Sequence, residues 1–301
     1  MCGGTLQKNY GGLKTVLLKT ENLKFVYSEK TPFERTAVSN INIEINKNDF
    51  IGLIGHTGSG KSTLVQLLNG LIKPTSGTVY YNGQNIFSKD FNLNELRFKV
   101  GLVFQYPEYQ LFDETVEKDI SFGPRNMGLS EEEITKRVQE AAQIVGLKPE
   151  LLSKSPFDLS GGEKRRAAIA GVIAMQPEVL ILDEPTAGLD PIGRDTILQM
   201  LKNYRLEHNT TVILVSHSIE DIARVANKAL VMNKGEVFMY DTVDNVFANG
   251  DSLTEIGLNI PHITKVFAGL KAKGIDVPQN VYTLDRAEEI LKNLFGKAGK
   301  Q

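Results

Sequence analysis

The sequence predicts an α/β fold with a parallel sheet at its centre, and three observations lead to that prediction. Two short segments, residues 179–182 and 211–216, are continuously apolar, as strands buried on both faces of a parallel sheet are. A helical pattern over residues 191–205 lies between them, which makes a βαβ-type unit. A third apolar segment, residues 50–54, leads directly into a glycine-rich loop and a helix.

The N-terminal part of the chain has the pattern of a hairpin. Apolar residues alternate over residues 17–27 and again over residues 37–45, which predicts two strands joined by a polar turn around Pro32. The other elements expected in this part are a helix at residues 62–70, ended by glycine, and strands at residues 77–81 and 100–104.

From Ser130 onward the pattern becomes helical. Ser130 is followed three residues later by Glu133, a capping box, and the segment ends at Gly146. The helical character continues beyond it, with an interruption near Pro156. We therefore expect a helical insertion of about residues 105–176 within the βαβ-type core.

Three regions are expected along the chain. Residues 1–16 have the composition of a flexible N-terminal tail, and residues 17–250 form the main domain. Residues 251–301 are expected to form a small C-terminal helical domain, with helices near residues 262–273 and 285–295.

Composition restricts the classes of function. Hydrophobic residues make up 41% and charged residues 23% of the 301 residues, which is ordinary for a soluble globular protein. A net charge of -2 argues against a nucleic-acid-binding surface. The single cysteine, Cys2, provides neither a disulfide framework nor a cysteine-based zinc site, as expected of a cytosolic protein. No apolar stretch approaches the roughly 18 residues needed to cross a bilayer, so a membrane role would depend on partners.

The glycine-rich loop GHTGSGKST fits the phosphate-loop pattern G-x-x-x-x-G-K-[ST]. Its glycines allow backbone N–H groups to surround phosphate oxygens, and the next helix presents its positive N-terminal end to them. We expect Lys61 to reach the β- and γ-phosphates of ATP and the Ser62 hydroxyl to ligate Mg²⁺. The side chain of His56, at a variable position, is expected to be a bystander. The nucleotide-binding residues expected here are Gly55, His56, Thr57, Gly58, Ser59, Gly60, Lys61, Ser62 and Thr63.

Two carboxylates, Asp183 and Glu184, follow the apolar strand at residues 179–182. Ligands bind at the carboxyl edge of a parallel sheet, so Asp183 is expected to hold Mg²⁺ through water. Glu184 is expected to act as the general base that polarises the attacking water. Alone, this segment would be interpreted as a strand that ends in a solvated acidic turn; the phosphate loop favours the catalytic interpretation.

A second glycine-rich segment, LSGGEKRRAAIAG, precedes a strongly helical run. Ser160, Gly161 and Gly162 offer a hydroxyl, backbone N–H groups and a helix N-terminus to an anion. Taken alone, the segment would be interpreted as a turn that caps a buried helix.

The order of these motifs resembles the ATP-binding-cassette (ABC) ATPases over nearly all of residues 17–250. The resemblance implies a P-loop NTPase fold: an ABC nucleotide-binding domain with a RecA-like core, an antiparallel β subdomain, a helical signature subdomain and a small helical C-terminal appendage. It also implies that two cassettes pair head to tail, each signature closing over the ATP bound by the other. The matching pieces are, in order, GHTGSGKST, Gln105, LSGGE, ILDEP, AGLD and His217.

The resemblance also implies roles for single residues. The signature residues Ser160, Gly161 and Gly162 are expected to contact the γ-phosphate of the partner cassette's ATP. Glu163 stands where the commonest signature has Gln, and we expect its charge to weaken closure slightly. The other implied contacts are adenine for Tyr27 (although a strand tyrosine more often only packs), Mg²⁺ for Gln105, the dimer seam for Asp190 and the γ-phosphate for His217.

Two longer stretches, residues 101–130 and 157–191, closely resemble an ATPase subunit of the energy-coupling factor (ECF, cobalt/vitamin) importers. The match is best to the second, or A-prime, ATPase. The resemblance implies a paralogous ATPase partner, with a homodimer still open. It further implies a transmembrane T subunit, a small substrate-binding S subunit, a peripheral place on the cytoplasmic face of the cell membrane, and ATP-driven uptake of vitamins or transition-metal ions.

An acidic stretch near Gln105 fits that resemblance. Between Tyr106 and Phe122, acidic residues are interleaved with aromatic ones, and Lys118 is the one basic residue. Such a stretch would suit a docked basic, amphipathic helix, so we expect the T subunit to dock near residues 105–122. The alternative is a solvated acidic loop. The acidic residues are Glu108, Asp113, Glu114, Glu117 and Asp119.

Other functions stay open at this point. The chain could serve another importer class, or be a soluble ABC protein that acts on nucleic acid or the ribosome. DNA-repair cassettes separate the two loops by long coiled coils, but no sustained heptads occur here. Ribosome-acting cassettes usually occur as two per chain, and this chain has one. An inactive regulatory subunit is disfavoured because Lys61, Asp183, Glu184 and His217 are intact, and we expect no nucleic-acid partner.

Overall fold

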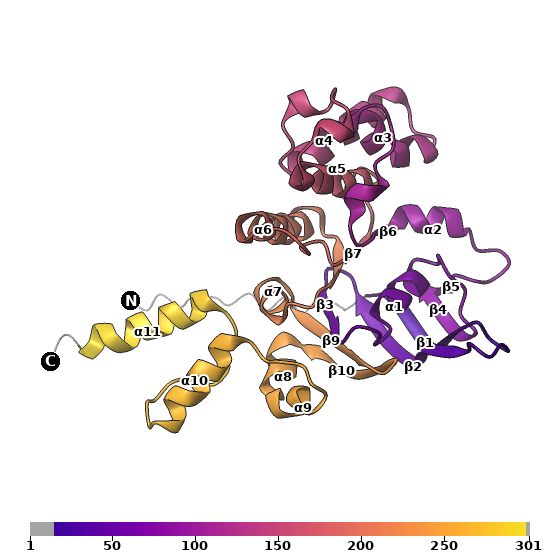
Figure 1. Ribbon diagram of the computed structural model, residues 1–301. Coiled ribbons are helices and arrows are strands. Elements are labelled where there is room, and N and C mark those ends of the chain that lie inside the picture. Colours follow the sequence, from indigo (N-terminus) through magenta and orange to yellow (C-terminus); the bar gives the residue numbers. More distant parts are fainter. Residues whose placement is uncertain (1–14, 299–301) are drawn as a thin grey trace, which may run out of the picture.

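The computed structural model describes residues 15–298, and its larger sheet has six strands in the order β10-β9-β3-β8-β7-β6 (Figure 1). All neighbours in this sheet are parallel except β10, which runs antiparallel to β9. The parallel sheet predicted from the continuously apolar segments is therefore confirmed. The strands are β3 (Phe50–Gly55), β6 (Val100–Val103), β7 (Val179–Asp183), β8 (Thr211–Val215), β9 (Lys228–Asn233) and β10 (Glu236–Thr242).

A second sheet is antiparallel and has the order β2-β1-β4-β5. Its long hairpin matches the alternating pattern seen in the sequence, and at its tip Tyr27 pairs with Arg35. This sheet is the antiparallel β subdomain that the ABC resemblance implied. Its strands are β1 (Val16–Tyr27), β2 (Arg35–Asn46), β4 (Ser76–Tyr81) and β5 (Gln84–Asn85).

The helices around the core sheet are α1 (Lys61–Leu68), α2 (Leu93–Lys99), α6 (Pro191–His208) and α7 (Ile219–Val225). The sheet is buried on both faces because neighbouring residues of β3 enter two different apolar clusters. Phe50 and Ile54 belong to one cluster, and Ile51 and Leu53 to the other. At Gly52 a Cβ would lie only 2.2 Å from a side chain of α7, so this glycine permits close packing of the helix on the strand.

A helical subdomain lies beyond β6 and β7, at the top of Figure 1. Ser130 caps its second helix by accepting a hydrogen bond from the Glu133 N–H, as predicted. Buried residues of all three helices, among them Ile120, Val138 and Ile169, pack in one cluster. The subdomain contains α3 (Val116–Asn126), α4 (Glu131–Ile144) and α5 (Gly161–Ile173), with 3-10 helices at Pro107–Gln110, Pro149–Leu151 and Pro156–Asp158.

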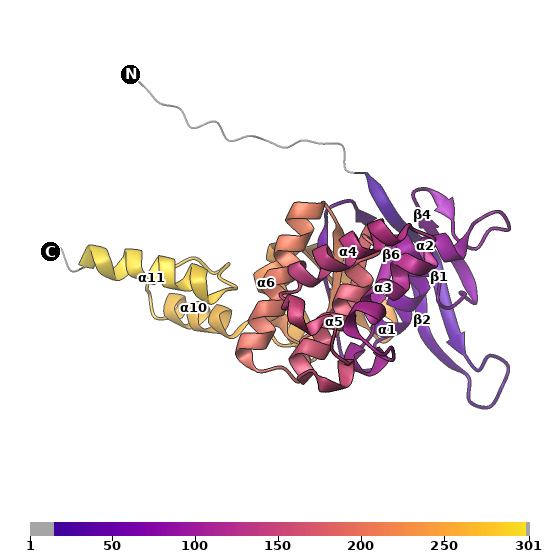
Figure 2. The same cartoon turned by 90° about the horizontal axis from the view of Figure 1, so that it is seen from above.

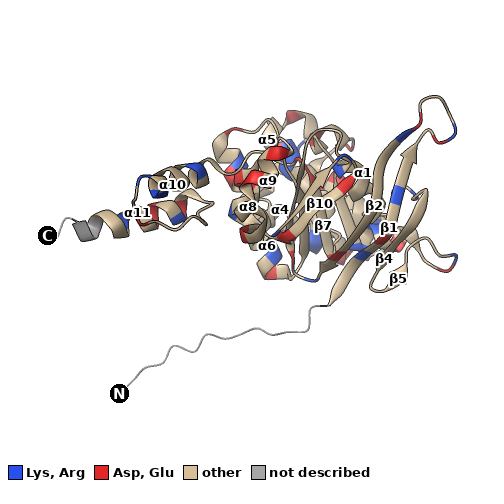
Figure 3. Ribbon diagram, turned by 90° about the horizontal axis from the view of Figure 1, so that it is seen from below, with Lys and Arg blue, Asp and Glu red and all other residues tan. Residues whose placement is uncertain are grey.

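The C-terminal helices are α8 (Val243–Ala248), α9 (Gly250–Glu255), α10 (His262–Ala272) and α11 (Leu284–Ala298). Phe247 and Leu253, on α8 and α9, pack in the core of the main body. The last two helices have a small cluster of their own around Phe267 and Val281 and project to one side (Figure 2). Both signs of charge are interspersed along them (Figure 3). Between residues 15 and 298, no helix combines the length and apolar character needed to cross a membrane.

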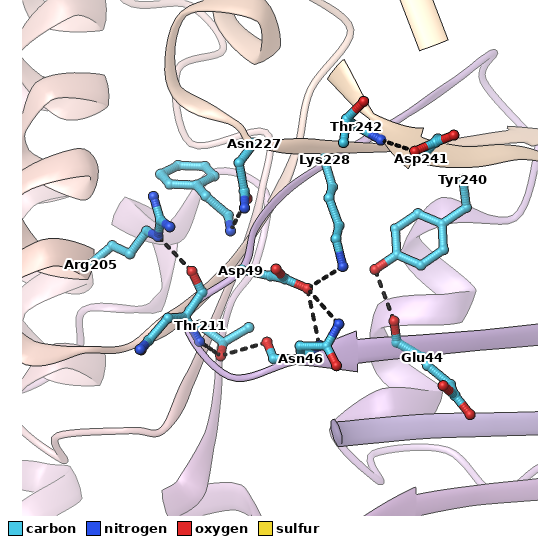
Figure 4. Close-up of polar contacts among 12 residues, drawn as sticks. Glu44, Asn46, Asp49, Arg205, Thr211, Asn227, Lys228, Tyr240, Asp241 and Thr242 are labelled. Atoms are coloured by element: carbon cyan, nitrogen blue, oxygen red, sulfur yellow. Dashed lines mark hydrogen bonds and ion pairs between the residues drawn. The ribbon is translucent and has the colours of Figure 1, made fainter. Parts of the chain in front are cut away.

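Polar contacts brace the sheet where its parallel strands begin (Figure 4). Lys228 Nζ donates to Asp49 Oδ2 at 2.7 Å, and the same oxygen accepts from the Asn46 N–H at 3.1 Å. The Tyr240 hydroxyl donates to the Glu44 carbonyl oxygen at 3.0 Å. These contacts tie the antiparallel sheet to β9 and β10, far along the strands from the glycine-rich loop.

Candidate functional site

A cleft of about 270 Å³ lies where β3 and β7 end and α1 begins. Most of the site residues predicted from separate segments of the sequence share this cavity. The lining residues are Tyr27, Arg35, Ala37, Thr57, Gly58, Gly60, Lys61, Ser62, Thr63, Gln105, Asp183, Glu184 and His217.

Two glycines allow the phosphate loop to adopt its conformation. Gly55 and Gly60 have φ angles of 153° and 99°, which L side chains rarely adopt. A Cβ on Gly55 would lie 2.4 Å from the Met232 carbonyl oxygen, and one on Gly60 would lie 2.5 Å from the Ala37 carbonyl oxygen. Because Gly60 also precedes the first residue of α1, the N-terminus of that helix faces the cleft.

Lys61 is held at the centre of the loop. Its ammonium donates to the carbonyl oxygens of Gly55, at 2.7 Å, and His56, at 3.0 Å. Burial lowers the pKa of Lys61, while the charges of Glu184 and Asp183 act in the opposite direction. A buried cation with acidic neighbours on one side suits the binding of a phosphate on the other.

Glu184 follows the last residue of β7 and has the features of a general base. Burial raises its pKa to about 7; the nearby charge of Asp183 adds to this rise, while a backbone hydrogen bond from His217 and the charge of Lys61 oppose it. Its φ angle of 54° is unusual for a residue other than glycine and is typical of strained functional positions. A carboxyl with this pKa can accept a proton near neutral pH.

His217 follows β8 and stands beside Glu184. Its Nε2 lies 3.3 Å from Glu184 Oε1, but the two atoms are not aligned for a hydrogen bond. Burial and the charge of Lys61 lower the pKa of His217, with the charge of Asp183 opposing them, which favours the neutral imidazole. A neutral imidazole here can donate to an oxygen of a bound phosphate.

The oxygen donors of this cleft fit Mg²⁺. The Ser62 hydroxyl, the Gln105 amide and the Asp183 carboxylate line the same cavity, and Mg²⁺ prefers such hard oxygen ligands together with water and substrate phosphates. Among the described residues, Glu184 Oε1 is a buried acceptor with no hydrogen-bond partner.

Tyr27 and Arg35 form one wall of the cleft, at the tip of the β1–β2 hairpin. The Tyr27 ring is 43% exposed, and its hydroxyl lies 3.2 Å from the Thr63 hydroxyl. Phe25 packs edge to face on the same ring, at 4.8 Å between ring centroids. Sequence reasoning missed Arg35; the signal would have been its place across the hairpin turn from Tyr27, which only the strand register reveals.

The signature residues Ser160, Gly161 and Gly162 lie outside the cleft, as does Asp190. Ser160 caps α5, and its hydroxyl donates to Glu163 Oε2 at 2.7 Å. Those hydrogen bonds lower the pKa of Glu163, so its carboxylate stays charged beside the signature serine. Asp190 caps α6 by accepting from the Gly193 N–H at 2.8 Å.

Two residues of the predicted loop point elsewhere. The Ser59 hydroxyl is buried without a hydrogen-bond partner in the described part of the chain, and it faces Gly55 rather than the cleft. The His56 side chain turns away to the C-terminal part of the chain, where its Nε2 lies 2.7 Å from the Ile256 carbonyl oxygen. Together with Gly55, His56 lines a neighbouring cleft of about 280 Å³.

The acidic stretch at residues 105–122 is only partly a surface feature. Glu108 is paired with Arg165, and Asp119 is buried, where it accepts from the N–H groups of Phe112 and Asp113. Phe112 and Phe122 are exposed and contact each other edge to face. The acidic side chains left on this surface are Asp113, Glu114 and Glu117, and Glu114 is paired with Lys118.

Comparison with known proteins agrees with this geometry. A sequence model of the family described as ABC transporter matches residues 38–187. Energy-coupling factor transporter ATP-binding proteins EcfA2 are similar: the Clostridium tetani protein is 54% identical over 92% of this chain and 97% of its own length. The Acetivibrio thermocellus protein is 48% identical over 93% of this chain and 99% of its own.

Solved structures are similar as well. CbiO1 from Clostridium perfringens, described as part of the ABC transporter complex CbiONQ, has a TM-score of 0.71 and 38% identity, over 84% of this chain and 99% of its own. The ATP-binding cassette MJ0796 was solved as a dimer in a post-hydrolysis state bound to ADP and Pi. It has a TM-score of 0.66 and 28% identity, over 75% of this chain and 99% of its own. The chain therefore belongs to the ABC transporter family and, within it, to the ATP-binding proteins of energy-coupling factor transporters.

Proposed function

We propose that this chain is the ATP-hydrolysing subunit that powers an energy-coupling factor importer. One observation carries the proposal: Lys61, the neighbouring Asp183 and Glu184, and His217 come from three segments and meet in one cleft of a chain that belongs to this family. The other importer classes and the soluble nucleic-acid or ribosome functions have no comparable support.

The cleft residues have different roles in ATP hydrolysis. The phosphate loop and Lys61 bind the phosphates, Tyr27 stacks on the adenine, and Glu184 accepts a proton from the attacking water. His217 donates to a γ-phosphate oxygen. Mg²⁺, held through Ser62, Asp183 and Gln105, would neutralise charge on the phosphates.

The second loop serves a second cassette. Ser160, Gly161 and Gly162 lie outside this chain's own cleft, so they are placed to contact ATP bound by a partner ATPase, with Asp190 at the seam. ATP then holds two cassettes together, and hydrolysis lets them reopen. A paralogous ATPase is the proposed partner. The dimeric MJ0796 cassette, solved with ADP and Pi, supports such pairing.

Transport requires membrane partners. The exposed part of residues 105–122, with Phe112, Phe122 and Glu117, is the proposed dock for a transmembrane T subunit, through which an S subunit supplies the cargo. The chain would then lie peripherally on the cytoplasmic face of the cell membrane. The cargo class is a vitamin or a transition-metal ion.

Two variants test the enzymatic part. Glu184→Gln should keep ATP binding but lower kcat by about 10²–10⁴-fold, since it removes the general base. Lys61→Ala should abolish tight nucleotide binding, measured by calorimetry. A Glu184→Gln variant with wild-type kcat would refute the assignment of the base.

A third variant tests docking. Neutralising Asp113, Glu114 and Glu117 together should reduce co-purification with two small membrane proteins from gentle detergent, while leaving nucleotide binding intact. Unchanged recovery of the complex would count against the proposed dock.

A further inference from the structure

The phosphate loop contacts the turn after α9 through the side chain of His56. The backbone carbonyl of His56 accepts from Lys61 Nζ at 3.0 Å and from the Ser59 N–H at 3.1 Å. Its imidazole Nε2 lies 2.7 Å from the Ile256 carbonyl oxygen, 200 residues further along the chain. With the ring N–H donating, one residue binds the loop through its backbone and the C-terminal segment through its side chain.

The carbonyl that accepts this hydrogen bond is held firmly. Ile256 is the C-cap of α9, and the turn there is closed by two hydrogen bonds, from the Gly257 N–H to the Thr254 carbonyl at 2.8 Å and from the Leu258 N–H to the Leu253 carbonyl at 2.9 Å. Leu253 is fully buried in the main core. The turn is therefore a fixed anchor for the imidazole.

Gly257 is also shaped for this contact. Its φ angle is +79°, and a Cβ built there would lie 3.0 Å from His56 Nε2. A side chain would press directly on the imidazole. Gly274, in the turn after α10, has nearly the same φ angle, +82°, but no atom of residues 15–298 lies within 4 Å of its Cβ position. Gly257 and Gly274 therefore have nearly the same φ angle, but of the two only Gly257 faces His56.

A cleft of about 280 Å³ surrounds the contact and brings three segments together. It is lined by the phosphate loop at Gly55 to Thr57, by His217 of the switch segment, and by residues 257–259 of the C-terminal segment. The loop that would hold the nucleotide and the residue that would contact its γ-phosphate therefore both border the turn after α9.

We propose that His56 is a positioning residue: its imidazole docks the phosphate loop onto the turn at Ile256–Gly257 and so raises the affinity of the loop for nucleotide. The inference rests on the proposed function, namely that the loop binds MgATP. It assigns a role to a side chain that the motif alone would leave as a bystander. The mechanism is preorganisation, because a loop held in one conformation loses less freedom when phosphate binds.

Calorimetry with MgADP, which is not hydrolysed, tests the inference on the full chain. A hydrogen bond of this kind contributes about 0.5–1.5 kcal/mol, so His56→Ala should weaken MgADP binding about two- to tenfold. His56→Gln, whose amide N–H can still reach a carbonyl, should recover part of the loss. Unchanged affinity in His56→Ala would overturn the inference, and the exposed position of His56 makes misfolding of that variant a minor concern.

The two glycines separate a specific effect from general destabilisation. Gly257→Ala should weaken MgADP binding, whereas Gly274→Ala, with the same backbone strain, should not. In the His56→Ala background, Gly257→Ala should cause no further loss of MgADP affinity, because the imidazole that the new Cβ would contact is absent. Equal losses for Gly257→Ala and Gly274→Ala would contradict the inference. If the wild-type chain fails to bind MgADP, the proposed function itself falls, and the inference with it.

Discussion

Arg165 and Glu108 form a bidentate ion pair, and both side chains are largely buried. Arg165 Nε donates to Glu108 Oε2 at 3.0 Å, and Nη2 donates to Oε1 at 2.6 Å. The remaining guanidinium nitrogen donates to the carbonyl oxygens of Pro185 and Ala187, directly after Glu184. The signature helix α5 is thus joined both to the segment that follows Gln105 and to the chain beside the proposed general base.

This pair should contribute strongly to stability. Arg165→Leu would leave Glu108 as an unpaired, largely buried carboxylate, and such losses cost about 3 kcal/mol or more. The control is Arg224→Leu, since Arg224 pairs with Asp195 at the same 2.6 Å but in an exposed position, where a pair contributes about 1 kcal/mol at most. Urea unfolding followed by circular dichroism measures both, and similar losses in the two variants would contradict the prediction.

The pH dependence of hydrolysis should reflect Glu184. Burial raises its pKa to about 7, and only the carboxylate can accept a proton from water. We therefore expect kcat/KM for MgATP to fall about tenfold for each pH unit below 7 and to level off above it. Glu184→Gln is the control for titration of ATP itself: the residual kcat/KM of this variant should not fall in this way below pH 7. A wild-type profile that is flat between pH 5.5 and 8 would disprove the assignment.

The charge of Glu163 should oppose pairing of two cassettes. Its carboxylate binds the Ser160 hydroxyl and N–H, so it places a negative charge where a partner's γ-phosphate would arrive. Glu163→Gln keeps the geometry and removes the charge. In a Glu184→Gln background with MgATP, we expect this variant to shift the population toward dimer by a few-fold, measured by analytical ultracentrifugation. An equal or smaller dimer fraction would show that the charge is neutralised locally.

Local pattern and motif spacing were enough to predict much of the fold. The buried strand at β3, the helix after the glycine-rich loop and the cap at Ser130 each depend on neighbouring residues, and each was predicted correctly. Helix α3 lies within the predicted helical insertion, but its bounds were not predicted, and Pro124 lies inside it. The prediction could not separate surface charge from the buried carboxylate of Asp119.

The contacts that sequence reasoning did not find join segments far apart in the chain. Arg35 enters the cleft only because the hairpin register sets it opposite Tyr27. The hydrogen bond between His56 and Ile256 depends on how α9 packs on the core, which no local pattern encodes. A single sequence indicates which residues can do chemistry, but the partners of a side chain follow from packing.

The brace at the base of the sheet allows stability to be separated from nucleotide binding. Lys228 donates to Asp49 where strands β9 and β3 begin, and both side chains are mostly buried. Lys228→Met keeps the length of the side chain but leaves Asp49 buried without its cation, which should lower the free energy of unfolding by about 3 kcal/mol. Because the brace lies at the end of the strands away from Gly55 and Lys61, the Kd for MgADP should stay within twofold of wild type.

A variant that unfolds more easily but binds MgADP normally would match this prediction. A large loss of affinity would mean that the two ends of the sheet are coupled. The matched variant Asp49→Asn, with Lys228 left as the unpaired partner, should show the same separation.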